Sequence, residues 1–451
     1  ALVVTAVNPL CYNALSGSIS ANSSQGMAPY FYSLNGGGFT LVPAFRMLGA
    51  GTYTLLVMDN RNCITNNVVV LTQPDQLKFT VENITDIDDP LLERANRDGL
   101  DWKDLAHQQI DLFRGDMENL RVIPPAHYIG AVDAIPLVVD AIKDLDSLST
   151  IYQVDTDQYF SVHADTRFGS RSHLSQEQMI STFSERGGDP DRLGKKDPLD
   201  CLLWMSQRPN EPGWDSSLGV GRPGWHIECS AMSAKYLDTP FDIHGGGMDL
   251  LFPHHESEIA QTTGCHGCAP AKTWIHNNMV TINGQKMGKS LGNFITLEDL
   301  FAGTHDGLSQ AYDPMSIRFF VLQAQYRSTL DFSDAALSAS SKGYKRWIQG
   351  LRALMSYEPA VFEATPGPNT TGPGGLLDPD VLDAKARAAL NDDLNSPVLI
   401  ATLYELLADF QELRNGKTQN TPEAWNRLRQ TVQIYVEDVL GFPLTTLSSE
   451  E

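Results

Sequence analysis

The sequence lacks long apolar runs, a signal-like start and any abundance of cysteine. No run approaches the ~18 consecutive apolar residues that a membrane span requires. The first residues, ALVVTAVNPLCYNALSG, have neither the basic start nor the defined apolar centre of a secretory signal. Six cysteines in 451 residues are too few for a disulfide scaffold. These absences predict a soluble, cytoplasmic protein with no membrane partner.

Positive charge is also scarce. The chain has 33 Lys and Arg against 55 Asp and Glu, which gives a net charge of −22. This balance argues against a surface that is generally coated by nucleic acid, and we expect no DNA partner, although a local basic groove that holds RNA is compatible with it. A length of 451 residues predicts two or three domains, each able to bury a core.

The first 78 residues differ in texture from the rest. Their few charged side chains are Arg46, Asp59, Arg61, Asp75 and Lys78. Short β-rich runs such as YFYSL, GTYTLLVMD and NNVVVLTQ are separated by clusters of Gly, Asn and Ser. Period-2 alternation of side chains along these runs, together with frequent turns, predicts a small antiparallel sandwich over residues 1–78.

This β-rich segment also resembles the SprB-type repeat of large bacterial surface adhesins. The resemblance is carried by PYFYSLNGGGF, LGAGTYTLLVMDNRNC and LTQP. Such repeats often pair cysteines at the places where Cys11 and Cys63 stand. An unrelated β-module is the alternative.

The remainder of the chain is α/β and then helical. Residues 79–333 begin with FTVENITDIDDP, which predicts a strand running into an acidic loop, and continue with helical periodicity. Residues 334–451 contain long amphipathic patterns that are typical of a helical bundle. The run EATPGPNTTGPGGLLDPD predicts a flexible linker near residues 364–380.

A cysteine, a histidine and a glutamate form a candidate metal set. His254 and Glu258 are four residues apart in PHHESEIAQ, so on a helix they project from one face. Cys229 ends the apolar segment GWHIEC. Thiolate, imidazole and carboxylate are all zinc ligands, and three protein ligands leave one position for substrate. His244 and His255 compete for the histidine role, and a solvated ion pair is the commoner outcome for an isolated pair of this spacing.

Two further motifs suit a nucleotide. The three glycines of DIHGGGMD let a backbone approach a flat ligand or a phosphate closely, although a plain turn explains them equally well. In KMGKS, Lys286 and Lys289 lie in a loop between a strand-like and a helix-like segment. Two lysines there are suited to neutralise charge on a triphosphate, and a solvated surface loop is the alternative.

The remaining cysteines suggest no metal. Cys265 and Cys268 form a CxxC pair, but the sequence has no second CxxC to complete a structural zinc site, so a pair of loop thiols is favoured. Cys201 lies in the apolar run PLDCLLWM and is expected to be a small buried side chain.

Taken together, the downstream motifs resemble cysteinyl-tRNA synthetase, a class I aminoacyl-tRNA synthetase. The residues that carry the resemblance are GRPGWHIECSAMS, FDIHGGGMDLLFPHHESEIAQ, WIHNNMVTINGQKMGKSLGNF, MSIRFFVLQAQYRSTLDFS and LNDDLNSP. Residues 79–228 lean toward the related cysteine ligase of mycothiol synthesis, which joins cysteine to an amino sugar. The segments NITDIDDPLLERANRDG, MENLRVIPPAHYIGAVDAIP and ERGGDPDR carry that second resemblance.

The resemblance implies a site for cysteine. One zinc ion would be held by Cys229, His254 and Glu258, and would bind the substrate as its thiolate. Thiolate coordination is a physically sound way to reject serine without an editing site. Trp225 and Thr85 match positions that line the amino-acid pocket of the family.

The resemblance also implies a site for ATP, which would enter with Mg. Gly246, Gly247 and Asp249 fall near the adenosine site of the family. Lys289 matches the ATP-contacting lysine of the KMSKS loop, which is written KMGKS in this chain, and Lys286 is retained beside it. Both lysines are therefore the candidate catalytic residues.

The chain departs from the family pattern upstream. Class I synthetases carry an H-x-G-H signature in the first strand-to-helix turn, and this sequence contains no such motif. The family's fourth zinc ligand is a cysteine before that turn, but Cys11 and Cys63 lie in adhesin-like sequence. We therefore expect a Rossmann-like core without its first strand and phosphate-binding turn. The chain also ends at DVLGFPLTTLSSEE, where we expect more anticodon-binding sequence.

These features predict a fold and three functions. The fold is an α/β Rossmann-like class I synthetase core, incomplete at its start, with an N-terminal β-sandwich-like module and a C-terminal helical bundle. The leading function is ATP-dependent activation of cysteine and its transfer to tRNA, because a helical domain suits an RNA acceptor. One alternative is ligation of cysteine to an amino sugar. Another is a non-catalytic mosaic, or a surface adhesion or display protein.

Overall fold

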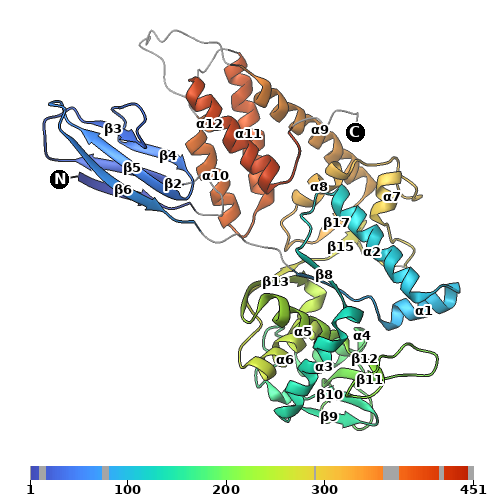
Figure 1. Ribbon diagram of the computed structural model, residues 1–451. Helices are drawn as coiled ribbons and strands as arrows, with labels where there is room; N and C mark the ends of the chain where they lie inside the picture. The colour runs from blue at the N-terminus through green and yellow to red at the C-terminus, as the bar shows by residue number, and fades with distance from the viewer. Residues whose placement is uncertain are drawn as a thin grey trace. The chain divides into compact units, whose positions relative to one another are not determined.

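The chain forms two compact units, Ala1–Thr80 and Val81–Glu451. The computed structural model describes residues 2–9, 17–73, 81–288, 291–358, 375–415 and 421–444 (Figure 1). Among these residues, no helix is both long and apolar enough to cross a bilayer.

The first unit consists of two three-stranded antiparallel sheets. In spatial order, one sheet is β1 (Leu2–Val7), β2 (Gly17–Ser23) and β4 (Ala44–Leu48), and the other is β3 (Phe31–Leu34), β5 (Gly51–Met58) and β6 (Ile64–Leu71). Alternate residues of β2, of β5 and of the end of β6 are buried, which brings Ile19, Leu55 and Leu71 into one apolar core. The antiparallel sandwich expected from the sequence is confirmed. Cys63 is exposed, and Cys11 lies outside the described residues.

Parallel strand pairs form the centre of the second unit. The first pair is β7 (Val81–Ile84) with β8 (His127–Gly130), and the second is β13 (Phe241–Gly247) with β14 (Ala271–Asn277). Helices α1 (Asp89–Asp98) and α2 (Trp102–Asn119) connect the first pair, and α6 (Glu256–His266) connects the second. Parallel strands joined through helices are the βαβ arrangement of a Rossmann-like fold.

The two parallel pairs are not hydrogen-bonded to each other in the part of the chain that the structure describes. In a doubly wound sheet with the order 3-2-1-4-5-6, the first strand lies between strands 2 and 4. Removing it leaves two groups, 3-2 and 4-5-6, that no longer share a strand, and β8-β7 and β13-β14 are likewise two separate parallel pairs. The separation agrees with a core that lacks its first strand.

A connective region is inserted between the two pairs. Its antiparallel sheet has the spatial order β12 (Gly221–Pro223), β11 (Cys201–Ser206), β10 (Asp157–Phe160) and β9 (Ile151–Val154). The 3-10 turn η1 (Val162–Ala164) and α4 (Gln176–Glu185) complete it. The apolar side of α3 (Ala131–Ser147) shares a core with this sheet, in which Phe160 and Trp204 are fully buried. This core also buries Cys201, as the sequence suggested.

The second unit ends in a small sheet and a helical bundle. The sheet has the order β16 (Gln285–Lys286), β15 (Val280–Ile282) and β17 (Leu330–Phe332). The helices are α7 (Leu297–Ala302), α8 (Pro314–Leu322), α9 (Asp334–Ser356), α10 (Pro379–Asn391), α11 (Ser396–Arg414) and α12 (Pro422–Gln433), followed by the π-turn η6 (Ile434–Val439). Apolar residues three or four positions apart give α9 one buried face. Trp347 on this face lies in one core with Trp425 and Phe442.

Part of the expected linker is ordered. Residues 359–374 lie outside the described part of the chain, but the 3-10 turn η5 (Gly375–Leu377) buries Leu376 and Leu377. Asp378 then caps α10 by accepting a hydrogen bond from the backbone N–H of Asp380. The linker prediction was therefore wrong for residues 375–380, because two leucines at the end of the Pro/Gly-rich run join the bundle core.

Candidate functional site

Two helix starts bring the candidate metal ligands together. Helix α5 (Trp225–Leu237) begins at Gly224, where an added Cβ would lie 2.1 Å from the carbonyl oxygen of Leu202. Only glycine allows the helix to begin this close to β11. On the other side, the 3-10 turn η2 (Met248–Leu250) leads into the π-helical turn η3 (Leu251–His255), which runs directly into α6. Cys229 comes from α5, His254 from η3 and Glu258 from α6.

Cys229, His254 and Glu258 converge in a buried cluster. One ligand atom from each lies within 4.8 Å of the others. The Nε2 atom of His254 is 2.8 Å from a carboxylate oxygen of Glu258, and both side chains are almost fully buried. The four-residue spacing therefore does place both side chains together, although the turn between them is partly π-helical. Sulfur, nitrogen and oxygen donors this close suit zinc.

A second set shares the same carboxylate. His244, His255 and Glu258 also have ligand atoms within 4.8 Å of one another, and His244 Nε2 lies 3.3 Å from Glu258. This set contains no thiolate, and His255 Nδ1 is 2.8 Å from His276 Nε2. The Cys229 set therefore offers the better zinc site, because it combines a soft ligand with an imidazole and a carboxylate.

Burial and neighbouring charges set the protonation of the cluster. Burial by itself would raise the pKa of Glu258, but His254 and His244 outweigh it and lower that pKa to about 2. Burial, together with the charges of Glu258 and Glu228, raises the pKa of the Cys229 thiol well above its ordinary value. A metal cation reverses this effect on a thiol that binds it, because it stabilises the thiolate. The donor set thus fits a cation.

Of the expected cysteine-pocket residues, Trp225 contacts this cluster and Thr85 contacts Glu228, which precedes Cys229 in the chain. The indole ring of Trp225 lies 4.4 Å from the ring of His254, measured between centroids, and Trp225 is 42% exposed. Thr85 follows β7 directly, and its hydroxyl is 3.5 Å from the carboxylate of Glu228. An exposed ring beside a buried metal set is suited to cover a small bound molecule.

Asn83 is a site residue that the sequence reasoning missed. Its side-chain amide donates a hydrogen bond of 2.7 Å to the sulfur of Cys229. Asn83 lies on β7, two positions before Thr85, which directly follows the strand. This two-residue spacing from Thr85 is the feature of the sequence that could have indicated Asn83 as a site residue.

The nucleotide candidates lie at the end of β13. Gly246 and Gly247 are its last residues and Asp249 is in η2. A Cβ added at Gly246 would lie 2.7 Å from the ring of His255, so this glycine is required for close packing rather than for a turn. Lys286 is exposed on β16, whereas Lys289 lies outside the described residues. The structure therefore leaves the geometry of the lysine pair undescribed.

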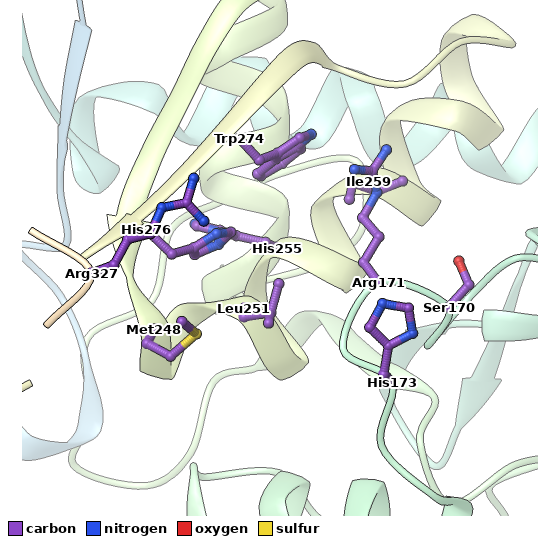
Figure 2. Close-up of a pocket in the computed structure, with 10 residues that line it drawn as sticks. All are labelled: Ser170, Arg171, His173, Met248, Leu251, His255, Ile259, Trp274, His276 and Arg327. Carbon is purple, nitrogen blue, oxygen red and sulfur yellow. The ribbon is translucent and has the colours of Figure 1, made fainter. Parts of the chain in front are cut away.

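A cavity of about 470 Å³ opens against His255, a member of the second set (Figure 2). It is lined by Ser170, Arg171, His173, Met248, Leu251, His255, Ile259, Trp274, His276 and Arg327. Seven of the ten residues lie in the motif segments that the sequence analysis singled out, whereas Ser170, Arg171 and His173 come from a connective loop in which it suggested no site.

Family models match three parts of the chain. Residues 47–342 match the tRNA synthetases class I (C) catalytic domain, residues 385–445 match the DALR domain, and residues 3–39 match the SprB repeat. The first of these matches covers more than half of the chain.

The chain is also similar to two bacterial proteins that carry the same name. A protein from Thermomonospora curvata is 45% identical over 324 residues, which are 72% of each chain, and one from Nocardiopsis dassonvillei is 44% identical over 364 residues, which are 81% of each chain. Both are named L-cysteine:1D-myo-inositol 2-amino-2-deoxy-alpha-D-glucopyranoside ligase.

The fold has counterparts among solved structures. The methionyl-tRNA synthetase of Mycobacterium tuberculosis in complex with methionyl-adenylate aligns with a TM-score of 0.51 at 14% identity, covering 80% of this chain and 81% of that one. This likeness supports a Rossmann-like synthetase core followed by a helical domain. With its catalytic-domain match and its relatives, the chain belongs to the family of class I (C) tRNA synthetase catalytic domains.

Proposed function

We propose that this protein is an ATP-dependent cysteine ligase that joins L-cysteine to an amino-sugar acceptor. The observation that carries the proposal is the buried convergence of Cys229, His254 and Glu258 beside Trp225 and Thr85. Relatives with 44–45% identity that are named as ligases of this kind support the same function.

The thiol-binding half of the site follows from its donor set. Cys229, His254 and Glu258 would hold one zinc ion, which supplies a Lewis-acidic centre that prefers a thiolate to a hydroxyl. Asn83 would orient Cys229 through the hydrogen bond to its sulfur, and Trp225 would cover the bound amino acid. Cysteine would thus be separated from serine by its sulfur.

The activation half would use ATP with Mg. A carboxylate oxygen of cysteine attacks the α-phosphorus of ATP, the bond to the β-phosphate oxygen breaks, and pyrophosphate leaves. Gly246, Gly247 and Asp249 would border the adenosine, and Lys286 and Lys289 would neutralise the phosphates. The amine of the acceptor then attacks the carbonyl carbon, AMP leaves with the electrons of the broken C–O bond, and one proton passes to solvent.

An amino sugar is favoured over tRNA as the acceptor. The helical domain first suggested tRNA, but the Nocardiopsis dassonvillei relative matches 81% of this chain, which is more than the residues before 334 could supply. The similarity therefore extends into the helical domain of a protein named for an amino-sugar acceptor. A helical domain by itself does not favour RNA.

A second candidate is a protein that binds zinc and cysteine without turnover. The absence of H-x-G-H in the sequence and the separation of the two strand pairs favour it. The SprB match over residues 3–39 is compatible with such a protein serving in adhesion or display.

Pyrophosphate exchange separates the two candidates. With zinc-loaded protein, we expect exchange of labelled pyrophosphate into ATP to require cysteine, and product to form with 1D-myo-inositol 2-amino-2-deoxy-α-D-glucopyranoside but not with tRNA. Exchange that is no faster with cysteine would overturn the catalytic proposal. Cys229→Ala should lose the bound zinc, whereas Cys265→Ala, a half-buried cysteine outside the cluster, should retain it. Equal zinc content in both variants would refute the ligand assignment.

A further inference from the structure

We infer that the 470 Å³ cavity is the acceptor subsite, that it takes a polyhydroxylated amine, and that Arg171, His173 and Trp274 determine its specificity. The inference rests on the proposed ligase function and adds a location and a set of residues to it. A cavity of this volume lies in the usual range for small-molecule sites. Figure 2 shows Arg171 and His173 rising from one loop and Trp274 and His276 lying on a separate strand.

The loop at residues 169–173 is held by a buried carboxylate. Glu256, in the first turn of α6, accepts hydrogen bonds from the backbone N–H groups of Gly169, Arg171 and Ser172 at 3.1, 2.7 and 2.9 Å. Glu256 is only 2% exposed, so these three bonds satisfy a charge that would otherwise be costly to bury. The loop is thereby fixed against α6 and presents Arg171 and His173 in a defined position.

The lining has the chemistry of a site for a polyol. The Arg171 guanidinium lies 5.7 Å from the ring centre of Trp274, and among the described residues no carboxylate pairs with it. Its five N–H donors are therefore available to hydroxyl groups. The ring of Trp274 stacks on His244 at 4.5 Å and 18°, which holds the indole in place as one wall. Rigid aromatic walls with a few polar donors are typical of small-ligand pockets.

Two histidines connect the cavity to the candidate thiol site. His255 lines the cavity, lies against Gly246, and has its ring 4.7 Å from that of His244. His244 in turn lies 3.3 Å from Glu258. A molecule in this cavity would therefore be separated from Gly246 by the ring of His255, and from Glu258 by the rings of His255 and His244.

The positive charge of Arg171 has a chemical use in such a site. An amine must be neutral to attack a carbonyl carbon, and a nearby cation lowers the pKa of an ammonium group. In a chain with a net charge of −22, Arg171, which no carboxylate in the described part of the chain pairs, favours the neutral, nucleophilic form of the acceptor amine beside this cavity.

The test separates acceptor binding from cysteine activation. Arg171→Ala should raise the KM for 1D-myo-inositol 2-amino-2-deoxy-α-D-glucopyranoside by about tenfold, the loss expected for hydrogen bonds from a charged donor. Cysteine-dependent pyrophosphate exchange should stay within about twofold of the unchanged protein, because the acceptor takes no part in that step. Arg167→Ala, an exposed arginine bonded to Asp165 that does not line the cavity, should change neither value.

An unchanged acceptor KM in Arg171→Ala would overturn the inference. So would a parallel loss of pyrophosphate exchange, which would assign the cavity to ATP or cysteine. If the unchanged protein shows no exchange, the proposed function fails, and saturation-transfer NMR with the same amino sugar then tests the cavity alone. Binding that Arg171→Ala weakens about tenfold and Arg167→Ala retains supports the subsite, whereas equal binding by all three proteins, or no binding by any of them, refutes it.

Discussion

The side-chain amide of Asn83 lies 2.7 Å from the sulfur of Cys229, although the two residues are 146 positions apart. The bond links β7, which belongs to the first strand pair, to α5, which carries the cysteine of the candidate metal set. Because an N–H donor stabilises a thiolate relative to a thiol, Asn83 favours the form of Cys229 that binds a metal.

Replacing Asn83 should therefore weaken zinc binding without removing a ligand. We expect Asn83→Ala to lower zinc affinity about 10- to 100-fold, the usual cost of losing a partner that orients a metal ligand. Competition with a chromophoric chelator measures this affinity. Asn67→Ala, an exposed asparagine on β6 of the first unit, is the control. An affinity that is equal in the two variants would show that the amide does not support the metal site.

Gly246 and Gly245 provide a matched pair. A Cβ at Gly246 would lie 2.7 Å from the His255 ring, whereas at Gly245 the nearest atom would be 3.9 Å away. We expect Gly246→Ala to cost about 1–3 kcal/mol of stability through overpacking against His255 and to slow pyrophosphate exchange, because the glycine borders the proposed adenosine site. Gly245→Ala should have little effect on either the stability or the rate of pyrophosphate exchange. Urea unfolding and the exchange assay measure the two effects, and similar behaviour of both variants would contradict the packing argument.

Asp157 should make the connective region sensitive to acid. It is fully buried, and its carboxylate accepts hydrogen bonds from Arg192 and Arg208, each at 2.6 Å. Burial would raise its pKa, but the hydrogen bonds from Arg192, Ser206 and Arg208 lower it overall. Because the pKa of Asp157 is lower in the folded protein than in the unfolded chain, its carboxylate stabilises the fold fully at pH values above the unfolded pKa of about 3.9. This stabilisation is lost as the pH falls through the pKa of the folded protein.

The corresponding variant is Asp157→Asn. At pH 7 the free energy of unfolding of this variant should be about 2–3 kcal/mol lower than that of the unchanged protein. The loss is smaller than for a wholly buried ion pair, because both guanidinium groups keep contact with water. Below about pH 4 the difference in stability between this variant and the unchanged protein should become smaller. Asp155→Asn, at a side chain that is 83% exposed, is the control and should have little effect. A loss that is equally large at pH 7 and at pH 3 would contradict the assignment.

Glu256 should control the mobility of the loop beside the cavity. In Glu256→Gln an amide replaces the carboxylate that accepts three backbone hydrogen bonds, so the N–H groups of Gly169, Arg171 and Ser172 should exchange with deuterium faster. Hydrogen-exchange mass spectrometry of peptides spanning this loop measures the change. Glu177→Gln, on the exposed side of α4, should leave the exchange rates unaltered. Unchanged protection in Glu256→Gln would show that the loop is held by other contacts.

The sequence by itself determined the features that depend on neighbouring residues. Alternation predicted the antiparallel module, helical periodicity predicted the C-terminal bundle, and a four-residue spacing brought His254 and Glu258 together. The motifs around Cys229 indicated the family. Local rules failed at Leu376 and Leu377, where composition suggested a linker but a nearby core was available to bury both side chains.

Only the tertiary structure decided what depends on contacts between distant segments. It brought Asn83 to Cys229, gave His254 rather than His244 or His255 the place beside the thiol, and joined Arg171 to Trp274 at one cavity. No spacing in the sequence encodes these contacts, because they depend on how α5, α6 and the connective loop pack on strands that come from other parts of the chain. Backbone periodicity fixes which side of an element is buried, and packing then fixes which residues meet there.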